Sequence, residues 1–257
     1  MPFTICAACH CHTGLVRQNN EDNFYFDGWS LQERNAGLSK PLTLSAPLTQ
    51  RQILAVFDGM GGEANGENAA FTAAKALFRA ANTLTCPGDG DFSLEAAQAM
   101  NLAVWESAKA LGTERMGSTL AMLTFREDHV YACNLGDSRI FRLREGALHQ
   151  LSLDHTDEAF LREQGIRRRP RLTQHLGINP EEFEIAPHVA GFFLRSGDWY
   201  VICSDGVTDL IDPGRLVDII YTTGDPALCA QSIVDTALSL GGRDNITVIV
   251  CRADEEI

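Results

Sequence analysis

The alternation of apolar and polar residues predicts strands at the start of the chain. β-Branched and aromatic residues in short runs indicate three strands, at residues 3–12, 23–29 and 52–57. In the first of them Phe3, Ile5, Ala7, Cys9 and Cys11 fall on one face, as expected for a period of two. The segment 32–49 is interrupted by glycine, proline and several Ser/Thr residues, and we expect a loop there.

The middle of the chain changes to a helical spacing. Residues 69–81 and 94–111 are rich in alanine and predict two helices, separated by a turn-rich segment at 85–92. The apolar runs 118–125, 129–134 and 139–144 follow, each separated by turn residues, and predict an antiparallel meander.

The last third of the chain mixes both patterns. A short polar helix is expected after Asp154, strands at 183–187 and 199–203, helices at 216–222 and 227–240, and a closing strand at 246–251. Runs of strands interrupted by paired helices favour α+β layers over an alternating parallel fold. A length of 257 residues is consistent with one domain, 1–257.

Composition narrows the classes of partner. The formal net charge of −13 argues against nucleic acid or insertion at an anionic membrane, since both need a basic or apolar surface. No apolar run approaches the length of a membrane span, and the N-terminus lacks the features of a secretory signal. Eight dispersed cysteines in such a chain are typical of reduced thiols, so a cytoplasmic location is expected.

Five short motifs place acidic residues where apolar runs end at turns. They are 17–22 (RQNNED), 58–62 (DGMGG), 136–139 (GDSR), 204–206 (SDG) and 244–245 (DN). Carboxylates that gather at the ends of buried strands repel one another unless cations neutralise them. Oxygen ligands favour Mg²⁺ or Mn²⁺ over zinc, and two such ions about 3.5–4 Å apart can promote hydrolysis of a phosphate ester. The candidate ligands are Glu21, Asp22, Asp58, the Gly59 carbonyl, Asp137, Asp205 and Asp244, with Arg17 as the candidate phosphate-binding group.

Each motif taken singly has an ordinary structural explanation, because Asp-Gly and Ser-Asp are common turn sequences. Other short patterns are weaker still. Cys6-Ala-Ala-Cys9-His10 matches a haem-attachment pattern, but the segment alternates like a strand; adventitious zinc capture by Cys6, His10 and His12 stays open. Residues 59–64 mimic a dinucleotide fingerprint without the βαβ unit that such a site needs, and no segment has the spacing of an EF-hand loop.

The five motifs together, in this order, resemble the metal-dependent type 2C serine/threonine protein phosphatases, in their bacterial stand-alone branch. The resemblance rests on segments 13–22 (TGLVRQNNED), 56–62 (VFDGMGG), 117–119 (GST), 134–139 (NLGDSR), 153–156 (LDHT), 202–211 (ICSDGVTDLI) and 241–250 (GGRDNITVIV). These segments cover nearly the whole chain. The resemblance implies an α+β fold: a four-layer αββα sandwich with two antiparallel β-sheets flanked by antiparallel helix pairs and the metal site at one end.

The resemblance also implies which residues bind two Mn²⁺ or Mg²⁺ ions in the core site. The residue that matches Asp58 bridges the two ions in this family. Those that match Asp205 and Asp244 complete the ligands of the first ion. Glu21 and the carbonyl of Gly59 match the ligands of the second ion.

Four further residues acquire expected roles in the same way. Asp22 matches the residue that holds a metal-bound water, and Arg17 matches the phosphate-binding arginine. Asp137, together with Asp205, matches the pair that binds a weaker third ion in bacterial members. Asn245, beside Asp244, is expected to be a supporting hydrogen-bond partner rather than a ligand.

The function implied is the hydrolysis of phosphoserine and phosphothreonine in proteins by direct attack of a hydroxide that bridges the two metals. The expected partners are phosphorylated proteins, namely Ser/Thr kinases and their substrates, and the enzyme is expected to be a monomer. One rival is a catalytically inactive scaffold that binds phosphoproteins. Another keeps the chemistry but acts on regulators of sigma factors.

The chain departs from the family pattern at two places. Some members carry a histidine after Asp-Gly that can act as general acid, but Met60 stands there in this chain, as is typical of bacterial members. The general acid is therefore open; His155 is a candidate, although a hydrogen-bonded turn residue is the simpler interpretation. The segment 156–172, which we call the flap, looks short, and Arg167, Arg168, Arg169 and Arg171 are clustered near its end. It is expected either to be a solvated loop or to steer phosphopeptides at the active-site mouth.

Overall fold

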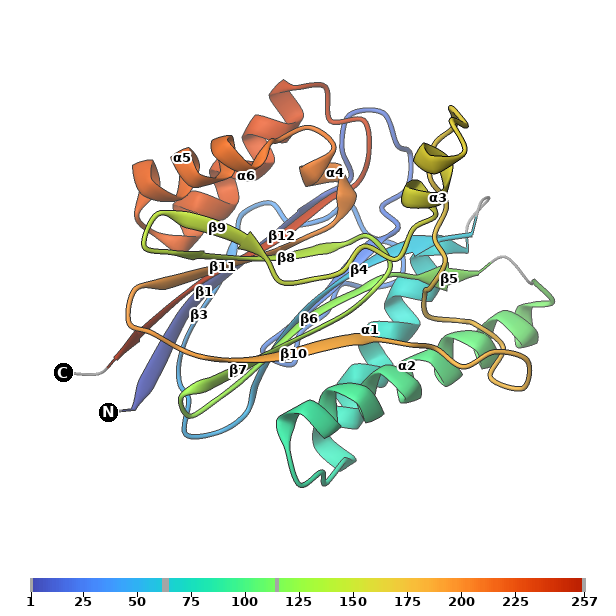
Figure 1. Cartoon of the computed structure of the whole chain (residues 1–257), viewed down its shortest axis with the longest axis horizontal. Helices are drawn as coiled ribbons and strands as arrows, with labels where there is room; N and C mark the ends of the chain where they lie inside the picture. Colours follow the sequence, from blue (N-terminus) through green and yellow to red (C-terminus); the bar gives the residue numbers. More distant parts are fainter. Residues whose placement is uncertain (1, 62–64, 114–115, 256–257) are drawn as a thin grey trace.

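The computed structural model describes residues 2–61, 65–113 and 116–255. Gly62 and Ala64, which end two of the motifs above, lie outside this part of the chain. Two antiparallel sheets pack face to face, and helices cover the outer face of each sheet (Figure 1). The expected four-layer αββα sandwich of the α+β class is therefore confirmed.

The first sheet contains both ends of the described chain. Its strands lie in the order β3 (Leu42–Pro47), β1 (Phe3–His12), β12 (Ile246–Glu255), β11 (Asp198–Cys203), β8 (Arg139–Arg144) and β9 (Ala147–Gln150). The second sheet has the order β10 (His188–Phe193), β7 (His129–Leu135), β6 (Leu120–Arg126), β4 (Gln52–Met60) and β2 (Asp22–Phe26). A two-residue strand, β5 (Gly117–Ser118), pairs with the end of β4.

Two helix pairs form the outer layers. Helices α1 (Gly66–Thr83) and α2 (Asp89–Leu111) cover the second sheet, whereas α5 (Pro213–Thr223) and α6 (Pro226–Ser239) cover the first (Figure 1). The short helices α3 (Glu158–Glu163) and α4 (Asp205–Thr208) lie in connecting segments. In the described part of the chain no helix is both long and apolar enough to cross a membrane.

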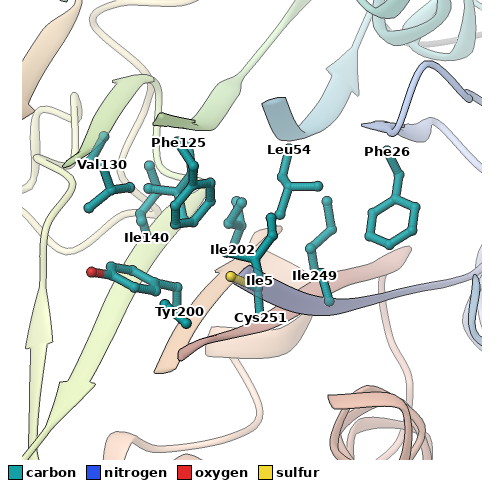
Figure 2. Close-up of a cluster of buried hydrophobic side chains, with 14 of the residues drawn as sticks. Ile5, Phe26, Leu54, Phe125, Val130, Ile140, Tyr200, Ile202, Ile249 and Cys251 are labelled. Atoms are coloured by element: carbon teal, nitrogen blue, oxygen red, sulfur yellow. The ribbon is translucent and has the colours of Figure 1, made fainter. Parts of the chain in front are cut away.

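The main core lies between the two sheets and follows from the period-two alternation of the strands. The inward face of β1 carries the predicted set Phe3, Ile5, Ala7, Cys9 and Cys11, all of them in one buried cluster. Figure 2 shows side chains from both sheets in this cluster, among them Phe125 and Tyr200, whose rings meet edge to face at 5.5 Å. The outward face of the same strand packs against α6, where Ala8 is fully buried.

The outer cores depend on small helix residues. The face of α1 toward the second sheet presents Ala69, Ala70, Ala73 and Ala74, all fully buried. Alanine favours a helix and adds little bulk, so the helix axis can approach the sheet closely. Helices α5 and α6 each begin with Asp-Pro, and the aspartate side chain accepts hydrogen bonds from backbone N–H groups of the first turn.

Several elements differ from the sequence-based expectation. The segment 32–49 is not only a loop, because residues 42–47 form β3 at the edge of the first sheet beside β1. The third strand of the predicted meander, β8, crosses to the other sheet and pairs with β11. The strand expected at 183–187 is wrong: the strand β10 begins at His188. The predicted turn 85–92 is shorter, since α2 starts at Asp89, and β9 and α4 were not expected.

Candidate metal centre

The acidic motifs lie at strand ends at one end of the sandwich. Strands β2 and β4 are antiparallel neighbours, and their register places Asp22 directly opposite Asp58. Asp137 lies in the turn between β7 and β8, Asp205 is the first residue of α4 after β11, and Asp244 lies in the turn before β12. Residues far apart in the chain therefore meet because their strands are neighbours.

Seven of the eight predicted site residues line a single pocket of about 420 Å³. They are Arg17, Glu21, Asp58, Gly59, Asp137, Asp205 and Asp244. Arg17 donates a hydrogen bond from Nη2 to Oδ2 of Asp244 at 2.8 Å, so the guanidinium lies beside the carboxylates. Met60 and Thr119 line the same pocket. Met60, which stands where some family members have a histidine, therefore lies beside the acidic groups.

Asp22, the eighth residue, lies beneath the pocket surface. Its side chain is only 2% exposed, and its Oδ2 accepts hydrogen bonds from Ser204 Oγ at 2.8 Å and from Thr247 Oγ1 at 2.7 Å. Burial raises the pKa of Asp22 to about 7; the two hydroxyl groups lower it, and the charges of Asp205 and Asp244 raise it. Asp22 is thus held in one orientation by two neutral donors.

The pKa values of Asp58, Asp205 and Glu21 are also raised. Burial is the main cause of the raised pKa of Asp58, and the negative charges of Asp22 and Asp205 add to it. Burial, together with the charges of Asp137 and Asp244, raises the pKa of Asp205 to about 6, although Arg169 lowers it. The pKa of Glu21 is raised by burial and by Glu67, against the opposing effect of Arg17. The site therefore has a deficit of positive charge.

This donor set fits hard divalent cations. The groups are carboxylate oxygens with one available backbone carbonyl, which Mg²⁺ and Mn²⁺ prefer, and a bound cation would relieve the repulsion that raises the pKa values. Among the described residues, no group of three or more His, Cys, Asp or Glu side chains is already arranged to coordinate a metal ion. Guanidinium groups neutralise part of the charge instead: Arg17 pairs with Asp244, and Arg169 pairs with Asp205 at 3.0 Å.

Two glycines are required for the backbone to come this close. A Cβ atom on Gly59 would lie 2.0 Å from the carbonyl oxygen of Gly66, and one on Gly206 would lie 1.9 Å from that of Asn245. Asn245 holds the same region together, because its Oδ1 accepts from the backbone N–H of Glu21 at 2.8 Å and its Nδ2 donates to two loop carbonyls. The expected supporting role of Asn245 is confirmed.

The flap reaches the mouth of the pocket. A bridge between Thr156 and Leu172 closes its base, and Arg169, Pro170 and Leu172 line the pocket. Arg169 lies 3.0 Å from Asp205 and 3.9 Å from Asp209, and its side chain is 71% exposed. The flap therefore lies at the mouth of the pocket, and its arginine-rich stretch is exposed. A cation at Asp205 would compete with Arg169 for that carboxylate.

The sequence did not predict a role at the pocket for Ser204, Thr247 or Thr119. Ser204 and Thr247 orient Asp22. The only hint in the sequence was that Ser204 belongs to the motif SDG and Thr247 to the family segment 241–250. Thr119 donates its backbone N–H to the Asp58 carbonyl and accepts from the Asp58 N–H through Oγ1. His155 is not among the residues that line the pocket; its Nδ1 accepts from the Gly136 N–H at 3.2 Å, as expected of a turn residue.

Comparison with known proteins settles the family. A protein phosphatase 2C family model matches residues 44–238. The chain belongs to the protein phosphatase 2C family. Among the similar proteins, the serine/threonine protein phosphatase PstP of Mycobacterium tuberculosis is 31% identical over 95% of this chain and 44% of its own length. The chain therefore spans less than half of that relative. The serine/threonine phosphatase stp of Listeria monocytogenes is 26% identical over 94% of this chain and 93% of its own length.

A solved structure of a serine/threonine protein phosphatase agrees with the fold. The catalytic domain of PstP, crystallised in complex with two manganese ions, has a TM-score of 0.78 to this chain at 27% identity, and it covers 98% of this chain and 100% of that chain. Those two manganese ions belong to the PstP structure. The agreement over nearly the whole of both chains places the ends of the strands that carry the acidic motifs within the shared fold.

Proposed function

We propose that this protein is a metal-dependent serine/threonine protein phosphatase that hydrolyses phosphoserine and phosphothreonine monoesters in proteins. The observation that carries the proposal is the convergence of Arg17 and five carboxylate groups on one pocket, from motifs spread over the whole chain. Family membership supports the same reaction class. The targets are phosphorylated proteins, namely Ser/Thr kinases and the substrates of those kinases.

Arg17, Asp22 and Asp58 have different proposed roles in the reaction. Arg17, whose side chain is 44% exposed, offers a planar pair of donors to a phosphate at the pocket mouth. Asp22 is held in one orientation by Ser204 and Thr247 and lies directly opposite Asp58, where its carboxylate can accept a hydrogen bond from a bound water. Asp58 lies on β4 opposite Asp22 and places its carboxylate in the middle of the acidic group.

The residues that would hold two Mn²⁺ or Mg²⁺ ions are Glu21, Asp58, the Gly59 carbonyl, Asp205 and Asp244, with Asp22 behind them. Asp137 and Asp205 would hold a weaker third ion. When bound, these ions supply Lewis-acid stabilisation of the phosphoryl oxygens and activate the attacking water. The general acid that protonates the leaving serine or threonine oxygen is left unassigned, because Met60 cannot donate a proton.

The flap is proposed to select protein substrates. Arg167, Arg168, Arg169 and Arg171 form a basic surface on an otherwise acidic chain, and Arg169 already lies at the pocket mouth. Charge reversal of Arg167 and Arg171 leaves the Arg169–Asp205 contact in place. It should raise KM for an acidic phosphopeptide and leave KM for a small aryl phosphate nearly unchanged. An equal effect on both substrates contradicts a role in substrate selection.

A single assay tests the main proposal. Hydrolysis of a phosphothreonine peptide is followed with Mn²⁺, with Mg²⁺ and with EDTA, for the wild type and for Asp205→Asn. Turnover should require the metal, and Asp205→Asn should lose metal affinity and turnover together. Asp218→Asn, on the exposed face of α5, is the matched control and should behave as the wild type. Binding of the phosphopeptide without turnover in Mn²⁺ would favour the scaffold instead, and full activity of Asp205→Asn would overturn the ligand assignment.

The remaining proposals concern the setting of the enzyme. All eight cysteines are free thiols, and six of them are buried, which suits a reducing compartment such as the cytoplasm. We also propose that the protein acts as a monomer, which sedimentation at micromolar concentration would test.

A further inference from the structure

The segment that carries Arg17 and Glu21 also lines a second pocket. Arg17 and Glu21 contribute to the metal pocket, whereas Gln18, Asn19 and Asn20, between them, contribute to another pocket of about 270 Å³. The rest of its lining comes from the connection between β2 and β3, through Glu33, Arg34 and Asn35, and from Glu67 in the first turn of α1. Three separate parts of the chain thus meet around it.

Two buried oxygen atoms in this lining have no hydrogen-bond partner among the described residues. Asn20 is 2% exposed and Glu67 is 7% exposed, yet Oδ1 of Asn20 and Oε2 of Glu67 are both unsatisfied. The amide nitrogen of Asn20 is fully used, since it donates to Cys11 Sγ at 3.1 Å and to Asn35 Oδ1 at 2.8 Å. Leaving a buried acceptor without a donor costs about 1–3 kcal/mol, so two in one pocket point to a missing ligand.

The chemistry of the lining indicates a cation. The two unsatisfied atoms are acceptors, and the pocket contains two carboxylates, Glu33 and Glu67, against one guanidinium, Arg34. No ion pair found in the described residues involves any of these three groups. Because the two oxygens are shielded from water, a metal ion can reach them more easily than a bulky ammonium group.

We propose that this pocket binds a hard divalent cation of the Ca²⁺ type, separately from the catalytic metals. Ca²⁺ accepts a flexible mixture of carboxylate, amide and water oxygens, and this pocket offers that mixture with only two carboxylates. The ion would fasten the segment 17–21 to α1 and so fix the backbone from which Arg17 and Glu21 project. The site does not depend on the proposed phosphatase reaction.

Diffraction from crystals soaked in Ca²⁺ locates the ion directly. We expect density within about 2.3–2.6 Å of Asn20 Oδ1 and of a Glu67 carboxylate oxygen. The proposal is overturned if the pocket contains nothing but an ordered water at a Ca²⁺ concentration that fills the catalytic pocket. An empty pocket at that concentration overturns it as well. This result is independent of turnover, so failure here leaves the phosphatase proposal intact.

Calorimetric titration with Ca²⁺ supplies the energetic test, with circular dichroism to show that each variant is folded. Removing a ligand charge in Glu67→Gln should weaken this binding event about tenfold or more, whereas removing the like charge in Arg34→Gln should tighten it a few-fold. The matched control is Glu106→Gln, on the exposed face of α2, which should change nothing. If Glu67→Gln and Glu106→Gln titrate alike, or if Arg34→Gln weakens binding, the assignment is wrong.

Discussion

Replacing Asp22 by asparagine should stabilise the metal-free protein at alkaline pH. The side chain is almost fully buried beneath the carboxylates of the pocket, and its pKa is raised to about 7 by burial. Asparagine has nearly the same shape and still offers one oxygen to the hydroxyl groups of Ser204 and Thr247. The substitution therefore removes a buried charge while the surrounding packing is kept.

The change in unfolding free energy caused by Asp22→Asn follows from the linkage between protonation and folding. In the unfolded chain Asp22 loses its proton near its ordinary pKa of 3.8, whereas in the folded protein it keeps the proton until about pH 7. Its contribution to stability therefore falls as pH rises between these values, and the loss is complete above the folded pKa. A shift of about three pKa units corresponds to about 4 kcal/mol in total, of which about 2.5 kcal/mol falls between about pH 5 and about pH 8.

Urea unfolding in EDTA at these two pH values measures the effect. The difference in unfolding free energy between Asp22→Asn and the wild type should rise by about 2–3 kcal/mol from about pH 5 to about pH 8. Taking the difference cancels the titrating groups that do not interact with Asp22. Asp218→Asn on the surface of α5 should show no such rise. A difference that is flat with pH, or that falls, would refute the assignment of a raised pKa to this carboxyl group.

Three further outcomes are expected. Arg17→Lys should lower kcat/KM for a phosphopeptide by about tenfold or more, mainly through KM, because an ammonium group cannot form the planar bidentate contact; unchanged KM would contradict the phosphate-binding role. Arg144→Met should lower the free energy of unfolding by about 3–5 kcal/mol in urea titrations, because it leaves the buried carboxylate of Asp198 without its charged partner. In the wild type, Arg144 donates two hydrogen bonds to Asp198, at 2.7 and 2.6 Å. A loss below about 1 kcal/mol would show that solvent already reaches Asp198. Gly206→Ala should weaken Mn²⁺ binding in calorimetry, because the added Cβ would displace the α4 turn from the backbone of Asn245. An unchanged affinity would mean that the turn can shift without cost.

Local patterns predicted the elements whose sequence preference and burial agree. The alternation in residues 3–12 predicted both the strand β1 and its inward face, and the alanine spacing predicted α1 and α2. The strand β3 was missed because its residues, LTLSAP, lie among Gly and Pro residues that favour a loop. What makes it a strand is its antiparallel pairing with β1 in the first sheet, and pairing partners cannot be deduced from a single segment.

The order and type of the residues set the chemistry of the site: five acidic motifs, an arginine four residues before Glu21, and glycines where the backbone comes close. The arrangement of these groups depends on the tertiary fold. The fold placed Asp22 beneath the pocket on the hydroxyl groups of Ser204 and Thr247 and brought Arg169 of the flap onto Asp205. It also left one side-chain oxygen each of Asn20 and Glu67, in a second pocket, without a hydrogen-bond partner among the described residues. The physical reason is that residue type sets charge and hydrogen-bonding capacity locally. Burial and partnership arise only when distant strands pair and exclude water.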